Sequence, residues 1–454
     1  MNWLEIAKQY EEEYKTTVKE LLKIPTVLKD YQPDNLEEPF GHEIRQALDF
    51  MLEMGKKDGF KVKDIDHYAG HIEFGQGEEV LGILGHLDVV PAGGKWDQPP
   101  FSAYEKDGKI YARGTMDDKG PTIAAYVAMK MIKDQGIQLN KKVRLILGCD
   151  EESGMRGIKR YLEKEKMPDL GFAPDAEFPL IYAEKGIYTF TYKGKSTDKL
   201  LLSLDAGDRF NVVPDVCVAK LSEDKEKAFL KFLKEHKIQG EVKDDEYIVY
   251  GKNAHAAWPH LGVNAISLMV KFLIKQTNNP FIHMLDKYLT NDYLGKKLGI
   301  DVTDKEMHEL TLNLAFIHYD GKDVSIGINI RYPKNYDFEA GEKKIIKAGK
   351  EFALTYHLEG DSKPHYVSPE DELVKALHQA YIKYTNDTET PILSIGGGTY
   401  SRMLKKAVAF GPALPGDEDL AHQPNEHLKI ADMIKAIAIY AESIVRLAGE
   451  KDEA

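Results

Sequence analysis

The amino-acid sequence predicts an α/β protein in which one domain, with a mainly parallel sheet flanked by helices, is split by an inserted α+β domain with antiparallel sheets. Three observations carry this prediction. The chain has 454 residues, which is more than a single hydrophobic core usually serves. Apolar strands alternate with helices in the first and last parts of the chain, a pattern typical of βαβ units. Between them, short strands of alternating polarity indicate antiparallel sheets.

The first part of the chain shows alternating strands and helices. The elements expected there are, in order, helices at 2–24 and 41–59, a buried strand at 78–90, a helix at 118–136, a strand at 141–153 and a helix at 155–166. Gly59 lies at the end of the second helix, where glycine is common, and Pro121 lies in the first turn of the third, where proline is tolerated. The strands are apolar runs, which predicts burial on both faces of a sheet.

The pattern changes near residue 186 and returns near residue 367. The elements expected in between are strands at 187–195, 200–208, 217–222, 246–252, 310–321, 324–333 and 351–359, with helices at 224–236, 264–276 and 338–350. The last part predicts a helix at 369–385, strands at 389–398 and 406–412, and a final helix from about 426. We therefore expect a first domain at 1–185 that is completed by 367–454, and an inserted domain at 186–366.

Composition and charge narrow the class of protein. The formal net charge is −13, which argues against nucleic acid as a partner because phosphate binding needs a basic surface. The first residues lack the apolar core of a signal peptide, and no run of about 18 apolar residues predicts a membrane span. Cys149 and Cys217 are the only cysteines, which fits a reducing compartment. We expect a cytoplasmic protein without membrane contact.

Acids and histidines recur where predicted strands end. They are His86 and Asp88, Asp117 and Asp118, Asp150, Glu151 and Glu152, Asp175 and Glu177, and His422. Taken singly, each group suits a helix cap or a solvated loop. Taken together they favour a site, because open α/β sheets bind ligands at the carboxyl ends of their strands.

The three consecutive acids at 150–152 need an explanation, because neighbouring carboxylates repel one another. Two histidines and several carboxylates suit divalent cations such as Zn²⁺, Mn²⁺ or Co²⁺. We expect two cations to neutralise the acids, with one glutamate holding metal and its neighbour moving protons. Two metals about 3.5–4 Å apart, bridged by a carboxylate and a water, generate a hydrolytic nucleophile. Asp88 could fix the tautomer of His86.

Motifs of competing chemistries are absent from the sequence. It contains no GxSxG, no HExxH and no GxxxxGK[ST] segment, so a serine nucleophile, a zinc helix and a phosphate loop are not indicated. The run Gly396-Gly397-Gly398 followed by Thr399 could instead present backbone N–H groups to a substrate carboxylate.

Five segments carry a resemblance to a known family: GHLDVVP, ARGTMDDKGP, DEESG, PDAEFP and LAHQPNEH. In this order they resemble the M20 metallopeptidases, the aminoacylase-1 and carboxypeptidase G2 clan, over nearly the whole chain. The DDKGP form, the inserted domain and the segments FNVVPD, NAHAAWP and NIRYP are similar to bacterial dipeptidases of the PepV type.

The resemblance implies two bound divalent ions, with Zn²⁺ expected before Mn²⁺ or Co²⁺. The implied ligands are His86 and Asp175 for one ion, Glu152 and His422 for the other, and Asp117 as the bridge. The peptide bond after Asp117 is expected to be cis. Glu151 would be the general base, and Asp88 would orient His86.

The inserted domain would be the family's lid. His255 would stabilise the tetrahedral oxyanion together with a metal, and Arg331 would bind the C-terminal carboxylate of the substrate. Asn211 and the loop Gly396, Gly397, Gly398 and Thr399 would make further substrate contacts.

The resemblance thus implies a dinuclear metal-dependent dipeptidase that acts on small peptides with a free C-terminal carboxylate, as a monomer or a homodimer. An N-acyl amino-acid or N-succinyl deacylase of the same clan is the alternative enzyme, with identical chemistry and an apolar slot on the amine side. A non-catalytic peptide or metal binder is a third possibility, against which Glu151 argues because a binder needs no base.

Overall fold

The computed structural model describes residues 1–449 and divides into two compact units. Unit 1 comprises Met1–Tyr182, Val367–Leu393 and the chain from Thr399 onward, and unit 2 comprises Ala183–Tyr366 and Ser394–Gly398. A mixed sheet with a parallel centre and a separate antiparallel sheet confirm the predicted fold class. The glycine run at 396–398 departs from the predicted division, since it folds with unit 2.

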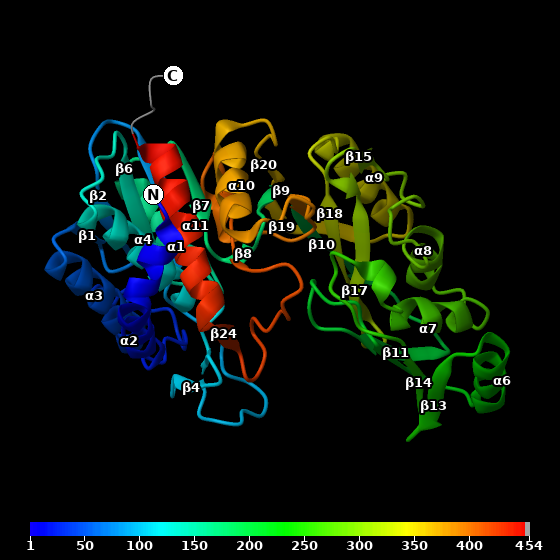
Figure 1. The fold of residues 1–454 in the computed structure, drawn as a ribbon. Coiled ribbons are helices and arrows are strands. Elements are labelled where there is room, and N and C mark those ends of the chain that lie inside the picture. Colours follow the sequence, from blue (N-terminus) through cyan, green and yellow to red (C-terminus); the bar gives the residue numbers. More distant parts are fainter. Residues whose placement is uncertain (450–454) are drawn as a thin grey trace. The chain divides into compact units, whose positions relative to one another are not determined.

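The main sheet of unit 1 is parallel at its centre (Figure 1). Seven of its nine strands are, in spatial order, β1 (Lys61–Ile65), β2 (Ala69–Phe74), β6 (Lys142–Gly148), β3 (Val80–His86), β7 (Leu170–Ala173), β22 (Ala407–Ala409) and β9 (Ile181–Glu184). β3 pairs in parallel with β6 and β7, and β7 pairs in parallel with β22. Every residue of β3 is buried, as its unbroken apolar run predicts.

Helices pack on both faces of this sheet. Ile72 of β2 packs on one helix, α3, while its neighbour His71 contacts Tyr161 of another, α5. Adjacent residues of a strand point to opposite faces, so α3 and α5 lie on opposite sides. The helices of unit 1 are α1 (Trp3–Ala7), α2 (Glu11–Leu22), α3 (His42–Lys57), α4 (Lys119–Asp134), α5 (Arg156–Lys164), α10 (Glu372–Thr385) and α11 (Ile430–Ala448).

Several elements of unit 1 differ from the sequence prediction. The N-terminal helix is interrupted by a 3-10 turn at Lys8–Tyr10. The last helix begins at Ile430, because residues 427–429 form the short strand β24 (His427–Lys429), which pairs with β5 (Lys109–Tyr111). The strand predicted at 389–398 shrinks to β21 (Leu393–Ile395). The remaining short strands of unit 1 are β4 (Tyr104–Lys106), β8 (Ala176–Glu177) and β23 (Pro412–Ala413), whereas β20 (His365–Tyr366) belongs to unit 2.

Unit 2 is built on one antiparallel sheet (Figure 1). Its strands, in spatial order, are β13 (Gln239–Lys243), β14 (Glu246–Tyr250), β12 (Val216–Leu221), β11 (Leu201–Ala206), β17 (Thr311–Tyr319), β18 (Asp323–Tyr332), β10 (Gly186–Lys195) and β19 (Thr355–Ser362). The unit also contains α6 (Glu226–His236), α7 (Ala265–Leu273), α8 (Pro280–Tyr288), α9 (Phe338–Glu351) and the hairpin β15 (Thr303–Asp304) and β16 (His308–Glu309). Alternate residues of the strands, such as Ile328 and Ile330, form a hydrophobic core with the helices.

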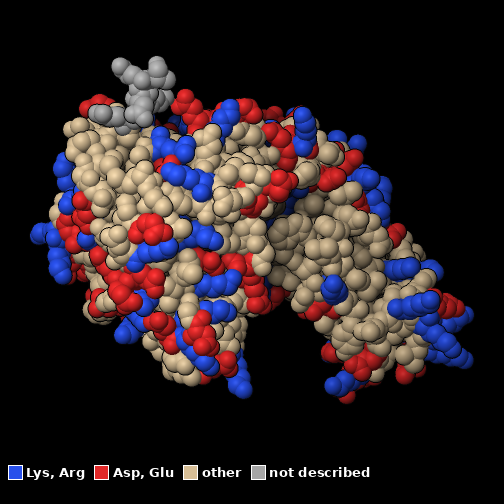
Figure 2. All heavy atoms as spheres, viewed as in Figure 1, with Lys and Arg blue, Asp and Glu red and all other residues tan. Residues whose placement is uncertain are grey.

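The surface shows mixed charge. On the face drawn in Figure 2, acidic and basic side chains are interspersed over the units, and no broad basic patch of the kind that phosphate backbones select is seen on that face. Within residues 1–449, no helix has the length and hydrophobicity to span a bilayer.

Candidate metal centre

The side chains predicted to bind metal gather at one edge of the unit 1 sheet. β3 ends at His86, and the loops that follow its parallel neighbours β6 and β7 carry Glu152 and Asp175. The carboxyl ends of parallel strands meet at one edge of a sheet. Asp117 reaches this edge from the loop before α4, and His422 from the loop before β24.

Asp117 links the two histidines. Its Oδ1 lies 2.9 Å from His86 Nε2, and its Oδ2 lies 2.8 Å from His422 Nε2. His86 Nε2 is also 3.7 Å from Asp175 Oδ2, and His422 Nε2 is 3.2 Å from Glu152 Oε2. One carboxylate that directs an oxygen to each of two histidine–carboxylate pairs suits a bridge between two cations. The peptide bond after Asp117 is cis, as the resemblance implies.

Two atoms at the centre of this group lack hydrogen-bond partners. His86 Nε2 and Asp117 Oδ1 are buried and have none among residues 1–449, although they approach one another. An unpaired buried polar atom costs about 1–3 kcal/mol, so a cation held by both atoms would relieve the cost. His86, Asp117 and Glu152 each offer a ligand atom, all within 4.8 Å of one another. Imidazole and carboxylate ligands fit Zn²⁺, Mn²⁺ or Co²⁺, so the residues fit the implied metals.

The electrostatics of the site favour added positive charge. Burial raises the pKa of Glu151, and the charges of Asp175 and Glu152 raise it further. Burial is also the main cause that raises the pKa of Glu152 and of Asp175. Contacts with Asp117 and Glu152 raise the pKa of His422 to about 10. Crowded carboxylates hold protons unless cations replace them, and bound divalent ions would reverse these shifts.

Asp88 holds the turn that carries the two glutamates. Its Oδ1 accepts the amide N–H of Glu151 at 3.0 Å, and its Oδ2 accepts that of Glu152 at 3.1 Å. His86 Nδ1 lies 3.0 Å from the main-chain oxygen of Asp88 and 3.7 Å from its carboxylate. The hydrogen bond that orients His86 is therefore made by the Asp88 carbonyl. A proton on Nδ1 leaves the Nε2 lone pair available to a metal.

Asp150 has a different partner from the two acids that follow it. Its buried carboxylate forms an ion pair with Arg156 and accepts the Ser153 hydroxyl at 2.6 Å. The Arg156 guanidinium lies over the Tyr31 ring at 4.2 Å. The expectation that cations neutralise all three acids at 150–152 is thus wrong for Asp150, because an arginine supplies its countercharge.

Sequence reasoning missed Glu426, which lies four residues after His422 in LAHQPNEH. Its buried carboxylate accepts the amide N–H of Met116 at 2.7 Å and that of Asp117 at 3.3 Å. The other oxygen accepts Arg113 Nη1 at 2.5 Å, and both members of this ion pair are buried. Glu426 therefore fixes the loop that presents the bridging carboxylate. An acid that follows a predicted ligand in the same motif is the only signal for it.

Asp118 connects the helix α4 to the strand that ends at His86. Its Oδ2 accepts the amide N–H of His86 at 3.0 Å and the Thr122 hydroxyl at 2.9 Å. The second acid of the DDKG segment thereby ties α4 to the end of β3.

In unit 2, Arg331 and the glycine run lie together. Arg331 is 5% exposed, and its Nη1 donates to the Gly396 carbonyl at 3.1 Å. A side chain at Gly396 would place its Cβ 2.9 Å from the Ala257 Cβ, so this close approach requires glycine. Thr399 belongs to unit 1, where it caps the 3-10 helix Tyr400–Met403; its contact with a substrate stays a prediction.

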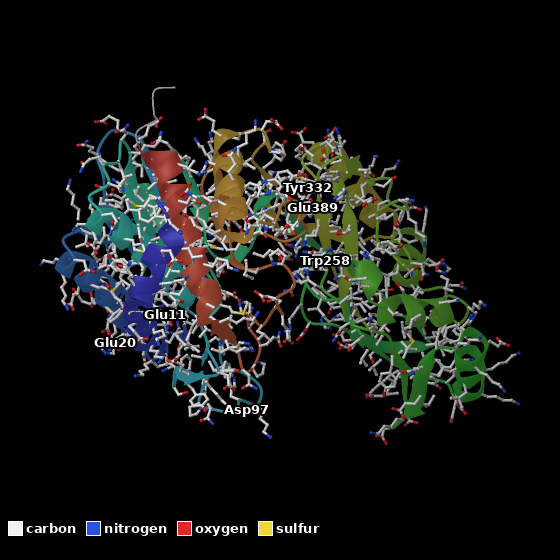
Figure 3. The ribbon with its side chains drawn as sticks, viewed as in Figure 1. Glu11, Glu20, Asp97, Trp258, Tyr332 and Glu389 are labelled. Atoms are coloured by element: carbon white, nitrogen blue, oxygen red, sulfur yellow. The ribbon has the colours of Figure 1, made fainter. Side chains whose placement is uncertain are left out.

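His255 lies on a loop of unit 2 beside an exposed aromatic ring. Burial lowers the pKa of His255, and the charge of Arg331 lowers it further, so the imidazole is neutral near pH 7. Its Nδ1 accepts the Ala257 amide at 3.2 Å, which places the ring proton on Nε2 as a hydrogen-bond donor. Trp258, labelled in Figure 3, is 48% exposed. The centroid of its ring lies 5.7 Å from that of His255. Asn211 is joined to the same loop by its carbonyl, which accepts the Ala256 amide at 2.9 Å.

Comparisons with known proteins place the chain in a family. The model of peptidase family M20/M25/M40 matches residues 82–446. "Putative dipeptidase SH1171" of Staphylococcus haemolyticus is 41% identical and "Putative dipeptidase YtjP" of Bacillus subtilis is 40% identical, each over 99% of this chain and 100% of the relative. The chain therefore belongs to peptidase family M20/M25/M40, which confirms the predicted family and the prediction of a peptide-bond hydrolase.

Solved structures share the fold at low sequence identity. Human carnosine dipeptidase 1 matches with a TM-score of 0.62 at 16% identity, over 98% of both chains. The Vibrio alginolyticus aminoacylhistidine dipeptidase matches with a TM-score of 0.60 at 14% identity, over 96% of both chains. These likenesses support the fold.

Proposed function

We propose that the protein is a dinuclear metal-dependent dipeptidase. The observation that carries the proposal is the Asp117 carboxylate, which directs one oxygen to His86 and the other to His422. Membership of a peptidase family and relatives named as dipeptidases at about 40% identity support the same activity.

Five residues would hold the two ions. His86 and Asp175 would bind one, Glu152 and His422 the other, and Asp117 both. Zn²⁺ is the first candidate, with Mn²⁺ or Co²⁺ as alternatives. When bound, the ions would supply Lewis-acid polarisation of the scissile carbonyl and a lowered pKa for the attacking water.

Glu151 would transfer the proton. Its backbone amide is held by the Asp88 carboxylate, and a carboxylate fixed beside the metal ligands could accept a proton and return it. Glu151 would take a proton from the attacking water and give it to the amine that leaves.

Unit 2 would supply recognition. His255, with its donor at Nε2, would stabilise the oxyanion of the tetrahedral intermediate. Arg331 would pair with the C-terminal carboxylate of the substrate. Asn211 and the loop of Gly396, Gly397, Gly398 and Thr399 would make further substrate contacts.

A substrate panel tests this function. Metal-reconstituted enzyme is given dipeptides, β-alanyl-His, tripeptides, dipeptide amides and N-acyl amino acids, and amine release is measured. We expect fast turnover of dipeptides with a free C-terminus and slow turnover of the other peptides. Preference for N-acyl amino acids would identify a deacylase instead, and no turnover of any compound by a protein with two bound metals would indicate a binding protein.

A further inference from the structure

Two neighbouring strands of the unit 2 sheet, β17 and β18, carry a row of polar residues on one face. Asn313 of β17 is paired with Asn329 of β18, and Thr311 is paired with Arg331. Directly opposite residues in antiparallel strands point to the same face, so these four side chains share it. Both asparagines are 1% exposed. Their neighbours Leu312, Leu314, Ile328 and Ile330 point the other way, into the hydrophobic core.

Asn329 holds the guanidinium of Arg331. Its Oδ1 accepts Arg331 Nε at 2.8 Å, while Arg331 Nη1 donates to the Gly396 carbonyl at 3.1 Å. Bonds at two edges of a planar group fix its plane as well as its position. Asn329 therefore sets the direction in which Arg331 presents its charge.

Asn313 holds the loop that carries Asn211. Its Nδ2 donates to the carbonyls on either side of that residue, at 3.2 Å to Phe210 and 2.8 Å to Val212. The same loop is bridged to the next one, since Val212 pairs with His255. The bond pattern requires an NH₂ group, because both partners are acceptors.

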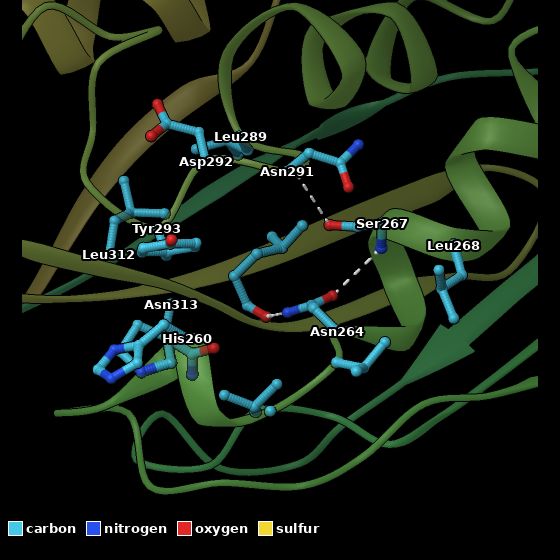
Figure 4. Close-up of a pocket in the computed structure, with 15 residues that line it drawn as sticks. His260, Asn264, Ser267, Leu268, Leu289, Asn291, Asp292, Tyr293, Leu312 and Asn313 are labelled. Carbon is cyan, nitrogen blue, oxygen red and sulfur yellow. Dashed lines mark hydrogen bonds between the residues drawn. The ribbon is translucent and has the colours of Figure 1, made fainter.

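A pocket of about 280 Å³ lies beside this arrangement (Figure 4). Asn313 lines it together with His260 and Asn264. Asn264 caps α7 and donates to the Leu314 carbonyl at 2.7 Å. The loop that follows His255 is thus anchored to the same strand as the loop of Asn211.

We propose that Asn313 and Asn329 are positioning residues that hold Asn211, His255 and Arg331 in one arrangement for a dipeptide. The inference rests on the proposed function. Asn329 acts on recognition of the substrate carboxylate through Arg331. Asn313 acts on the groups around the scissile bond through the loops of Asn211 and His255.

The test compares a free dipeptide with its C-terminal amide as substrates of metal-loaded enzyme. Asn329→Leu keeps the branched shape of the side chain, although leucine is somewhat larger, and removes the acceptor. We expect kcat/KM for the free dipeptide to fall by about 5–30-fold and that for the amide to change little, because a misdirected charge loses part of its contact. In an Arg331→Ala background, Asn329→Leu should have little further effect.

Asn313→Leu makes a different prediction. Because it removes the donor that holds the Asn211 loop, kcat should fall by about 5–30-fold on both substrates, with their ratio unchanged. Asn279→Ala is the matched control: Asn279 is a buried asparagine of unit 2 that caps α8, and its loss should leave both kcat and the ratio near wild type.

The outcomes are distinguishable. If wild-type enzyme does not prefer the free dipeptide to its amide, the proposed function and this inference both fail. If wild type shows the preference and Asn329→Leu keeps the same ratio, only the inference fails. Should the leucine variants not fold, Asn329→Ala and Asn313→Ala carry the same expectations, and thermal melts with metal analysis confirm that the variants compared are folded and loaded.

Discussion

Replacing Glu426 by Gln changes one oxygen of a buried carboxylate into an NH₂ group. In the native protein one oxygen accepts the amides of Met116 and Asp117, and the other accepts Arg113 Nη1 and the Gly114 amide. Glutamine keeps the first set of bonds. On the other side, its NH₂ group faces two hydrogen-bond donors, Arg113 Nη1 and the Gly114 amide. The substitution also removes the negative charge that compensates Arg113, which is 1% exposed.

The expected loss of stability in Glu426→Gln follows from the loss of a buried ion pair. Removing one partner of such a pair costs about 3–5 kcal/mol, because the remaining charge stays buried and uncompensated. Arg113→Met in the same chain removes that charge, so the double variant should recover about 1.5–3 kcal/mol relative to the sum of the single changes. Displacement of the Asp117 loop should also weaken metal affinity by about 10–100-fold.

Urea unfolding of chelated protein measures the stability without the metals. Trp3 and Trp96 belong to unit 1 and Trp258 to unit 2, so a Trp258→Phe background makes the fluorescence report on unit 1 alone. Metal affinity is then measured separately by competition with a chelating dye. A loss below about 1 kcal/mol together with unchanged metal affinity would refute the role of Glu426, since an uncompensated buried charge costs more than that.

Four further substitutions test the site and the stability of unit 1. Glu151→Gln should lower kcat by about 10²–10⁴-fold with metal content near wild type, whereas Glu152→Gln should lose one metal in elemental analysis; the reverse pattern would exchange the two roles. Arg331→Ala should reduce kcat/KM for free dipeptides by about 10–150-fold and affect dipeptide amides little, and equal losses on both would mean that it only holds unit 2 together. Burial, and then the charge of Arg144, lowers the pKa of His71 from 6.5 to about 4. As the pH falls, His71 therefore takes up a proton in the unfolded chain before it does so in the folded protein. The free energy of unfolding should drop by about 3 kcal/mol between pH 6.5 and 4. His71→Gln should flatten that decline in urea unfolding measured at several pH values, and an unchanged slope would show that another group causes it.

The sequence predicted the elements with strong periodicity and missed those decided by tertiary contacts. The apolar run of β3 and the amphipathic pattern of α3 are local signals, and both elements are present within a few residues of their predicted bounds. β1 was not predicted, because most of its residues are exposed to some degree. β2 was also not predicted, although nearly all of its residues are buried. The strand His427–Lys429 was included in the last helix, since only its pairing with β5 makes it a strand.

In the candidate site, too, residues with a local sequence signal were predicted and residues defined by tertiary contacts were missed. Motifs at strand ends identified the histidines and carboxylates that the structure brings together around Asp117. Residues that act through others carry no such signal: Glu426 is one acid in a polar loop, and Asn329 is one polar residue in a strand. Whether Asp88 orients His86 by its carbonyl or its carboxylate depends on side-chain geometry, which a sequence does not contain. Likewise, the pairing of Asp150 with Arg156 depends on how the turn closes.

The stoichiometry of metal required for activity tests the central claim most directly. Chelated protein is titrated with Zn²⁺, Mn²⁺ or Co²⁺ while dipeptide hydrolysis and bound metal are measured on the same samples, with Asp117→Asn in parallel. We predict two ions per chain at full activity, and loss of both tight binding and activity in Asp117→Asn, because this carboxylate faces both histidines. Full activity in verified metal-free protein, or two tightly bound ions in Asp117→Asn, would contradict a dinuclear centre bridged by Asp117.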